Sequence, residues 1–242
     1  MVGKSSKKIE TKGKTPGAAK PKPSPTPSKK LSFAARKKLA KRTSDKLREL
    51  YPAPSCALIY RNPFELLVAT VLSAQCTDKR VNAVAPKLFE RFPDARAFAN
   101  ASVEEIGEAI KSCGFYNSKA RNLSLASKVL VEKYDGKVPD DFDRLVELPG
   151  VGRKTANCVL GNAFHIASGF VVDTHVLRLS RKIGLSDETT PEKVEADLNK
   201  LFEPEDWIDA SHRLIYLGRE YCVARRPRGV VGPLKVFCLK RP

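Results

Sequence analysis

Residues 148–154 read Leu-Pro-Gly-Val-Gly-Arg-Lys, a turn with two glycines that leads into a predicted helix. Glycine adopts backbone angles that other residues avoid, and Gly150 and Gly152 place no side chain over the neighbouring amides. Free N–H groups at a helix N-terminus bind phosphates, and Arg153 and Lys154 add positive charge beside them. The stretch predicts a helix–hairpin–helix that contacts a DNA backbone, with an ordinary turn between two helices as the alternative.

Asp173 lies further along the chain, in the sequence Val-Asp-Thr-His, between a short apolar run and a predicted helix. Aspartate is a favoured N-cap, so its position suits the start of a helix over residues 174–183. A carboxylate can also accept a proton from an amine or stabilise positive charge. We expect both roles for Asp173, and a structural role for His175.

The remainder of the chain predicts an all-α fold. Capping residues precede several apolar segments, and apolar residues recur at helical spacing within them. Residues 64–74 are apolar nearly all round, which predicts a buried central helix. Only residues 166–172 resemble a strand, and one short run cannot form a sheet. The predicted helices cover residues 32–50, 63–74, 77–89, 102–114, 120–134, 143–148, 153–164, 174–183, 191–202 and 207–221.

The 242-residue chain has a net charge of +17, and most of that charge lies near its N-terminus. Residues 1–42 hold fourteen of the 44 Lys and Arg residues and a single acid, Glu10. Residues 1–31 are also rich in proline and contain little to bury, so we expect a disordered arm. The arm can attract nucleic acid electrostatically, or it can serve only to keep the protein in solution.

No apolar run is long enough to cross a membrane, and the N-terminus lacks the apolar core of a secretory signal. Six cysteines without a secretory signal suggest a reducing compartment. We therefore expect an intracellular, cytoplasmic protein. Four of the cysteines are predicted to be small buried hydrophobic residues: Cys56, Cys76, Cys113 and Cys158.

Five motifs, in their order and spacing, resemble endonuclease III, a family within the helix–hairpin–helix DNA glycosylase superfamily. The motifs occupy residues 72–78, 114–120, 148–157, 172–176 and 221–228. The resemblance implies a bifunctional DNA glycosylase and AP lyase, which removes oxidised pyrimidines from duplex DNA and then cleaves the abasic strand. The expected partner of the protein is double-stranded DNA with damaged bases or abasic sites. The protein itself is expected to be a monomer associated with the nucleoid.

The family fold has two helical domains with a DNA cleft between them. On this chain the resemblance implies a six-helix barrel over residues 56–166, which includes the helix–hairpin–helix at residues 143–164. Residues 32–55 and 167–242 would form the second domain. The basic arm over residues 1–31 lies outside the resemblance.

Lys154 matches the family's nucleophile, whose neutral amine attacks the sugar and forms a Schiff base. Asp173 matches the essential carboxylate. Gln75 matches the residue that faces the orphaned partner base, and Phe115 matches the apolar wedge that enters the base stack. The alternatives are a phosphate-binding Lys154, a helix C-cap for Gln75 and a core side chain for Phe115.

Members of the family usually hold a [4Fe–4S] cluster on four C-terminal cysteines. In this chain Cys222 and Cys238 match the first and fourth positions, whereas Gly229 and Gly232 occupy the second and third. Two thiolates cannot hold a four-iron cluster within one chain, so we expect no cluster and no other metal cofactor. The same segment keeps three arginines that are expected to contact DNA phosphates: Arg225, Arg226 and Arg228.

Two other functions stay open at this point. A monofunctional relative, such as the adenine-mismatch glycosylase, usually lacks a lysine at position 154 and carries a further C-terminal domain, and neither feature fits this chain. A catalytically weak or idle helix–hairpin–helix protein would still bind DNA but would have lost its activity together with the cluster. Trapping of a covalent DNA adduct distinguishes an active lyase from such a protein.

Overall fold

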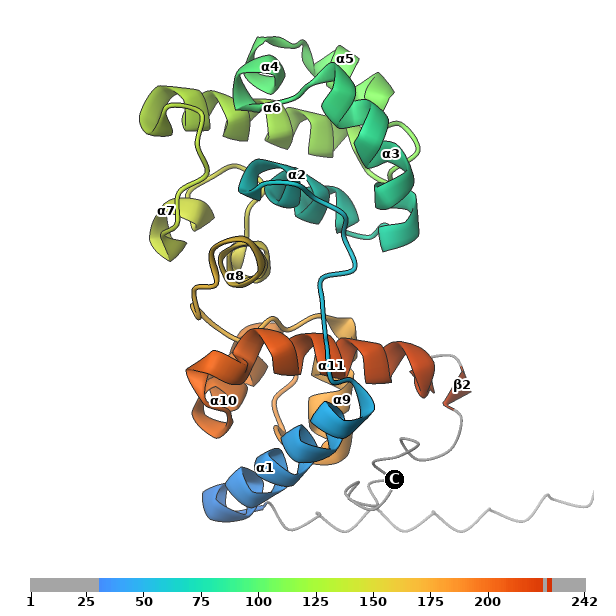
Figure 1. Cartoon of the computed structure of the whole chain (residues 1–242), viewed down its shortest axis with the longest axis vertical. Coiled ribbons are helices and arrows are strands. Elements are labelled where there is room, and N and C mark those ends of the chain that lie inside the picture. Colours follow the sequence, from blue (N-terminus) through green and yellow to red (C-terminus); the bar gives the residue numbers. More distant parts are fainter. Residues whose placement is uncertain (1–30, 224–225, 228–242) are drawn as a thin grey trace, which may run out of the picture. The chain divides into compact units, whose positions relative to one another are not determined.

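The computed structural model describes residues 31–223 and 226–227. Within that part the regular structure is helical, apart from one antiparallel pair of two-residue strands, which confirms the predicted all-α fold (Figure 1). The α-helices are α1 (Phe33–Leu50), α2 (Pro63–Ser73), α3 (Asp78–Arg91), α4 (Ala95–Asn100), α5 (Val103–Ala109), α6 (Tyr116–Tyr134), α7 (Phe142–Val146), α8 (Arg153–Val159), α9 (Thr174–Ile183), α10 (Pro191–Leu201) and α11 (Trp207–Glu220). The remaining elements are a π-helical turn (Leu160–Phe164), a 3-10 turn (Pro204–Asp206), β1 (Cys222–Val223) and β2 (Arg226–Pro227).

Side-chain caps determine where several predicted helices begin. Ser32 accepts a hydrogen bond from the backbone of Ala35 at the start of α1, and Asn62 caps α2 in the same way. Ser102 and Glu105 form a capping box at α5, in which each side chain bonds the backbone of the other. These bonds satisfy N–H groups that have no partner inside the helix, so the helix starts agree well with the prediction.

The structure differs from the predicted helices in several places. α4, which Asp94 caps, is absent from the predicted set because its short sequence shows too little apolar periodicity. α5 ends well before Gly114, and α6 starts at Tyr116 because Phe115 adopts a left-handed conformation that turns the chain into the helix. Residues 166–172 form no strand, in agreement with the expectation that this one short run cannot form a sheet.

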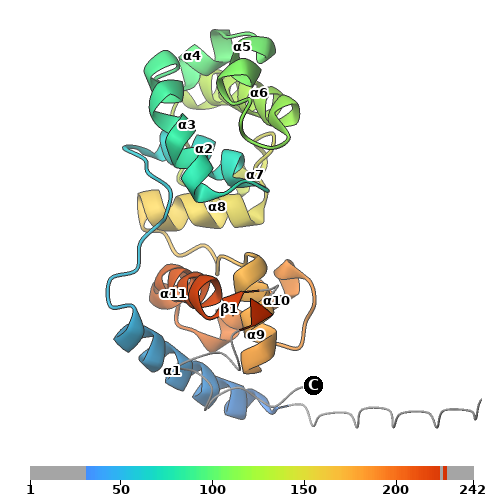
Figure 2. The ribbon, with the colours of Figure 1, turned by 90° about the vertical axis from the view of Figure 1, so that its right-hand side faces the viewer.

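Helices α2–α8 enclose one hydrophobic core and are called here the first lobe (Figure 2). α2 packs against α3, α6 and α8, and every residue from Phe64 to Leu72 is buried. The prediction of a buried central helix is therefore confirmed. Phe98 of α4 is fully buried and packs edge-on against Phe64, with ring centroids 5.5 Å apart.

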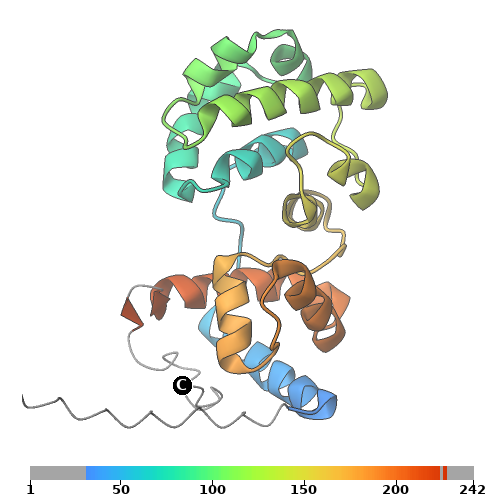
Figure 3. The ribbon, with the colours of Figure 1, turned by 180° about the vertical axis from the view of Figure 1, so that it is seen from behind.

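Helices α1, α9, α10 and α11 enclose a second core and form the second lobe (Figure 3). α1 precedes the first lobe in sequence and the other three helices follow it, so the chain enters and leaves the first lobe through the second. Phe170 and Phe202 pack in this core with ring centroids 5.3 Å apart. The domain boundaries near residues 56 and 166 stay a prediction.

Polar contacts join the two lobes. Arg219 of α11 forms an ion pair with Asp78 of α3 at 2.5 Å. His212 Nε2 of α11 lies 2.7 Å from Asn162 Oδ1, in the π-helical turn that extends α8. These contacts flank the space between α8 and α11, where the predicted site residues come together.

Candidate active site

A cavity of about 700 Å³ is lined by five of the ten predicted site residues: Gln75, Gly152, Arg153, Lys154 and Asp173. α8 contributes Lys154 to its lining, the start of α9 contributes Asp173, and the turn after α2 contributes Gln75. Both lobes line the cavity, and residues that are far apart in the sequence meet there. An amine, a carboxylate and an amide therefore face one volume.

The helix–hairpin–helix turn has the predicted form. Gly150 has φ +80°, which glycine tolerates, and a Cβ at this position would lie 2.8 Å from side-chain atoms of Asn122. Val151 is buried in the first core, as expected for a residue that packs back into the hairpin. A Cβ at Gly152 would meet no atom within 4 Å. The approach to the first turn of α8 is therefore open, and a ligand can reach its backbone N–H groups.

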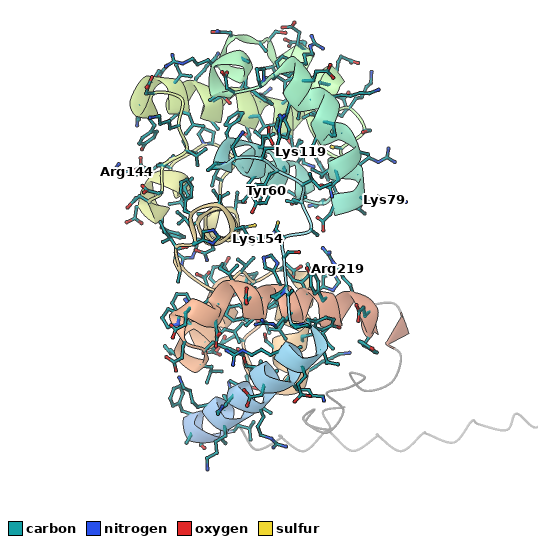
Figure 4. All side chains as sticks on the ribbon, in the orientation of Figure 1. Tyr60, Lys79, Lys119, Arg144, Lys154 and Arg219 are labelled. Carbon is teal, nitrogen blue, oxygen red and sulfur yellow. The ribbon has the colours of Figure 1, made fainter. Side chains whose placement is uncertain are left out.

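Lys154 is the second residue of α8, and its exposed side chain lines the cavity (Figure 4). Within the described residues no hydrogen bond or ion pair involves its ammonium group. A structural lysine is normally committed to such a partner or to bulk solvent. Lys154 instead faces a cavity that it shares with Asp173, where it can contact a bound molecule.

Arg153, the neighbouring cation, is held by the protein. Its Nη2 donates to Glu195 Oε1 of α10 at 2.8 Å, and its guanidinium lies 4.7 Å from the centre of the Phe142 ring. The hydrogen bond to Glu195 raises the pKa of Arg153. Glu195 is only 5% exposed and also accepts a hydrogen bond from Asn157 at 3.1 Å. This network fixes α8 to the second lobe. Glu195 is absent from the predicted site residues, because no local pattern marks one buried acid on an amphipathic helix.

Asp173 caps α9, as predicted. Its Oδ1 accepts hydrogen bonds from the backbone N–H groups of His175 and Val176, both at 2.8 Å. These bonds orient the carboxylate, and within the described residues they leave Oδ2 without a hydrogen bond. The side chain of His175 packs against Gly218, where an added Cβ would lie 2.8 Å from it, in keeping with a structural role.

Two thiols lie beside the lysine. Cys158, one helical turn after Lys154 on α8, lies close enough to Cys56 for the two thiols to interact. The interaction with Cys56, assisted by the charge of Lys154, lowers the pKa of Cys158 to about 7. The same interaction and burial raise the pKa of Cys56. Cys113 and Cys158 are buried as predicted, whereas Cys56 and Cys76 are only half-buried and line the cavity, so for them the prediction of burial is wrong.

Gln75 and Phe115 share an unusual backbone conformation. Both have positive φ angles, 53° and 57°, which residues with side chains seldom adopt. Gln75 is exposed and follows Ala74, the C-cap of α2, so the alternative of Gln75 as that cap is wrong. Phe115 is 66% exposed, so the alternative of a core side chain is wrong as well. Gln75 lines the cavity, whereas Phe115 lies outside the lining.

Several predicted residues have no described side chain. Arg225, Arg228 and Cys238 lie outside the described residues, and only the backbone of Cys222 and Arg226 is described, in β1 and β2. In the part of the chain that the structure describes, no group of three His, Cys, Asp or Glu side chains could hold a metal ion. No helix of that part is long and apolar enough to cross a bilayer.

The fold and the site together define a class of protein. A helix–hairpin–helix whose second helix presents a lysine to a cavity, with a fixed carboxylate in the same lining, is the arrangement of a base-excising DNA repair enzyme. The family model described as HhH-GPD superfamily base excision DNA repair protein matches residues 68–204. The chain belongs to this family.

Similar proteins narrow the class further. Endonuclease III of Synechocystis sp. is 52% identical over 181 residues, which cover 75% of this chain and 83% of the relative. Endonuclease III of Escherichia coli K12 is 42% identical over 183 residues, which cover 76% and 86%. A solved structure of a trapped covalent intermediate between endonuclease III and DNA has a TM-score of 0.80 at 42% identity, and the match covers 84% of this chain and 95% of that one. The protein is thus a base-excision-repair DNA glycosylase with AP lyase activity.

Proposed function

We propose that the protein removes oxidised pyrimidines from duplex DNA, with Lys154 as the nucleophile and Asp173 as the group that accepts its proton. One observation carries the proposal: an exposed amine and a carboxylate of fixed orientation line the same cavity. At about 700 Å³ the cavity can accommodate one extruded nucleotide. The endonuclease III relatives, one of which is trapped covalently on DNA, support duplex DNA as the partner.

The first covalent step exchanges the base for the lysine. The lone pair of Lys154 Nζ attacks C1′ of the deoxyribose, and the bond from C1′ to the base breaks with its electron pair leaving on the base. Asp173 takes the proton that the amine loses, and the departing base is protonated by water. The ring oxygen then leaves C1′ and is protonated, which gives an iminium ion on Lys154.

The second step cleaves the strand. The iminium withdraws electrons from C2′, so a proton on C2′ becomes acidic and is lost to a base. Its electron pair forms a double bond between C2′ and C3′, and the 3′ phosphate leaves with the electron pair of the C3′–O bond. Water then hydrolyses the iminium and returns Lys154 as an amine.

The proposed DNA contacts surround this chemistry. The open N–H groups at the start of α8, between Gly150 and Arg153, bind a phosphate of the damaged strand. Gln75 faces the orphaned partner base, and Phe115 enters the stack where the damaged base has left. The enzyme acts as a monomer. Further phosphate contacts come from Arg225, Arg226 and Arg228.

The donor set at the C-terminus does not fit the family's [4Fe–4S] cluster, and we propose that the enzyme works without one. Gly229 and Gly232 stand at two of the four ligand positions, and glycine has no side chain to coordinate iron. Lys154 and Asp173 belong to other elements, so no step above depends on iron. Protein purified without oxygen should contain no stoichiometric iron in elemental analysis, and iron at the level of a full cluster would overturn this proposal.

Reduction with borohydride tests the nucleophile, because it converts the iminium into a stable covalent adduct. With DNA that contains thymine glycol or an abasic site, the unmodified enzyme should form an adduct that Lys154→Ala abolishes. Lys128→Ala, on the exposed face of α6, is the matched control and should trap DNA normally. An adduct with Lys154→Ala would overturn the assignment of the nucleophile. DNA binding without any adduct in the unmodified protein would instead favour the idle DNA-binding protein.

A further inference from the structure

A second lysine, Lys119, is buried in the first lobe and has no part in the chemistry above (Figure 4). It is only 5% exposed, and burial lowers the pKa of its ammonium group. Its Nζ donates a hydrogen bond to the backbone carbonyl of Leu72 at 2.8 Å. No ion pair with a carboxylate is found for it among the described residues. A buried cation held only by a carbonyl is costly, since an apolar side chain would fill the same volume without desolvation.

The position of Lys119 connects the two segments proposed to contact DNA bases. Leu72 lies in the last turn of α2, immediately before the turn that carries Gln75. On the other side, the backbone N–H of Lys119 donates to the carbonyl of Phe115 at 3.1 Å, in the first turn of α6. The end of α2 carries the negative end of the helix dipole, which favours a positive donor there. The side chain of Lys119 thus reaches the end of α2, while its backbone belongs to the first turn of α6, which directly follows Phe115.

Two further contacts join the same segments. A Cβ on Gly114 would lie 3.5 Å from the carbonyl oxygen of Gln75, so an added methyl group would be in van der Waals contact with the Gln75 backbone. The thiols of Cys76 and Cys113, each adjacent to one of these residues, are close enough to interact, and Cys76 contributes to the raised pKa of Cys113. We call this set of contacts the loop junction, which comprises Leu72, Gln75, Cys76, Cys113, Gly114, Phe115 and Lys119.

We propose that Lys119 is a positioning residue for base extrusion: through the loop junction it holds Gln75 and Phe115 at a fixed separation, so that both can act on the same base pair. The inference rests on the proposed function and assigns a residue that prepares the enzyme for extrusion of the damaged base. Gln75 and Phe115 are exposed, and both have positive φ angles that only a well-determined surrounding maintains. Without the bond from Lys119 to Leu72, the two segments would shift independently.

The variant Lys119→Met keeps the length and volume of the side chain and removes its charge and donor. Loss of a charged hydrogen bond should slow extrusion of a paired lesion about 10- to 100-fold. A lesion that has no pairing partner needs less help to leave the helix, so there the defect should largely disappear. Lys128→Met, on the exposed face of the same helix, is the matched control and should behave like the unmodified enzyme.

Extrusion is measured by the fluorescence of 2-aminopurine placed next to the lesion in the same strand, a readout that requires no covalent chemistry and can be used on both substrates. The expected result is a slower rise with Lys119→Met on the paired substrate and recovery on a substrate with the lesion in a bulge. Equal rates for the variant and the unmodified enzyme, or an equal loss on both substrates, would overturn the proposal. Should Lys119→Met fail to fold, Lys119→Arg must extrude the base faster than Lys119→Gln, and equal rates would overturn it.

Borohydride trapping in parallel separates this proposal from the function on which it rests. Normal extrusion by the unmodified enzyme without a covalent adduct would reject Lys154 as the nucleophile and leave the role of Lys119 intact. An adduct in the unmodified enzyme together with unimpaired extrusion in Lys119→Met would support Lys154 as the nucleophile and reject the positioning role of Lys119.

Discussion

The cavity around Lys154 and the loop junction around Lys119 each place a lysine near a pair of cysteines, Cys56 and Cys158 in the cavity and Cys76 and Cys113 in the loop junction, and differ in how they hold the lysine; Cys76 also lines the cavity. Lys154 is exposed to the cavity and has no ion-pair partner among the described residues. Lys119 is 5% exposed and is bound to a backbone carbonyl. The residue type alone therefore does not determine the role: an accessible amine can react, and an enclosed one can hold two segments together.

The thiols of the two regions also differ, in the direction in which their pKa values are shifted. In the cavity, the interaction with Cys56 and the charge of Lys154 lower the pKa of Cys158 to about 7. In the loop junction, burial and the proximity of Cys76 raise the pKa of Cys113 to about 11. The cavity thus holds one thiol with a lowered pKa, Cys158, beside one with a raised pKa, Cys56, whereas in the loop junction the pKa of Cys113 is raised. This contrast matches a reactive site in the first case and a rigid support in the second.

The largest effect is expected at the carboxylate of the cavity. Asp173→Asn should slow single-turnover base release by about 10²- to 10⁴-fold, because an amide cannot accept the proton that the lysine loses. Asparagine is as good an N-cap as aspartate, so the free energy of unfolding should stay nearly unchanged. Quench-flow measurement of base release and urea denaturation of the same preparation test both parts.

The variant Asp173→Ala separates the two roles of this residue. It should show the same catalytic loss and, in addition, lose about 1 kcal/mol of stability with the missing cap. If Asp173→Asn released the base at the normal rate, the carboxylate would be structural only, and the contrast between the two regions would rest on Lys154 alone.

An intermediate effect is expected at the rim of the loop junction. Phe115→Ala should slow excision of a paired lesion about 10- to 100-fold, since the stacking of an aromatic ring on a base is lost. The side chain is 66% exposed, so its removal should leave stability unchanged. Leu125→Ala offers a matched control, because Leu125 is a 44% exposed apolar residue on α6, the helix that Phe115 precedes.

Phe115→Ala also tests whether the loop junction acts in base extrusion and the cavity in the covalent chemistry. The variant should still trap DNA normally at a preformed abasic site, where no base has to be extruded. An equal loss at abasic sites would place Phe115 in the chemical step and remove the distinction between the cavity and the loop junction.

The cavity could be predicted from the sequence more completely than the loop junction, because its signals are local. Lys154 follows a glycine turn and Asp173 precedes a helix, and both signals span only a few residues. The bond of Lys119 to Leu72 crosses 47 positions, and no helical periodicity records which residue meets the end of another helix. Lys119 lies in the motif at residues 114–120, yet its sequence context assigns it no role.

The same reasoning explains the burial predictions that were wrong. Cysteine is usually a small buried residue, which is correct for Cys113 and Cys158. Cys56 and Cys76 lie in connecting segments whose course depends on contacts far along the chain, and these segments line the cavity. Glu195 is the converse case, a charged residue buried by its pairing with Arg153 of another helix.

The smallest effect is a pH dependence of stability, and it should have opposite sign in the two regions. The pKa of Cys158 is about 7 in the folded protein, against 9.0 for an ordinary thiol. Its thiolate therefore contributes stability that is fully present above pH 9 and is lost as the pH falls through 7. The free energy of unfolding, relative to Cys158→Ala, should rise between these pH values by on the order of 1 kcal/mol.

Cys113 should behave in the reverse manner, because its folded pKa of about 11 lies above the 9.0 of an ordinary thiol. Its contribution is complete below pH 9 and is lost as the pH rises towards 11, so stability relative to Cys113→Ala should fall over that range. Urea denaturation of the three proteins at closely spaced pH values measures both slopes. Subtraction of each variant from the unmodified protein removes the titrating groups that do not interact with the replaced thiol. Slopes of the same sign would mean that the two thiol environments are alike and that burial, rather than the charge of Lys154, dominates in the cavity.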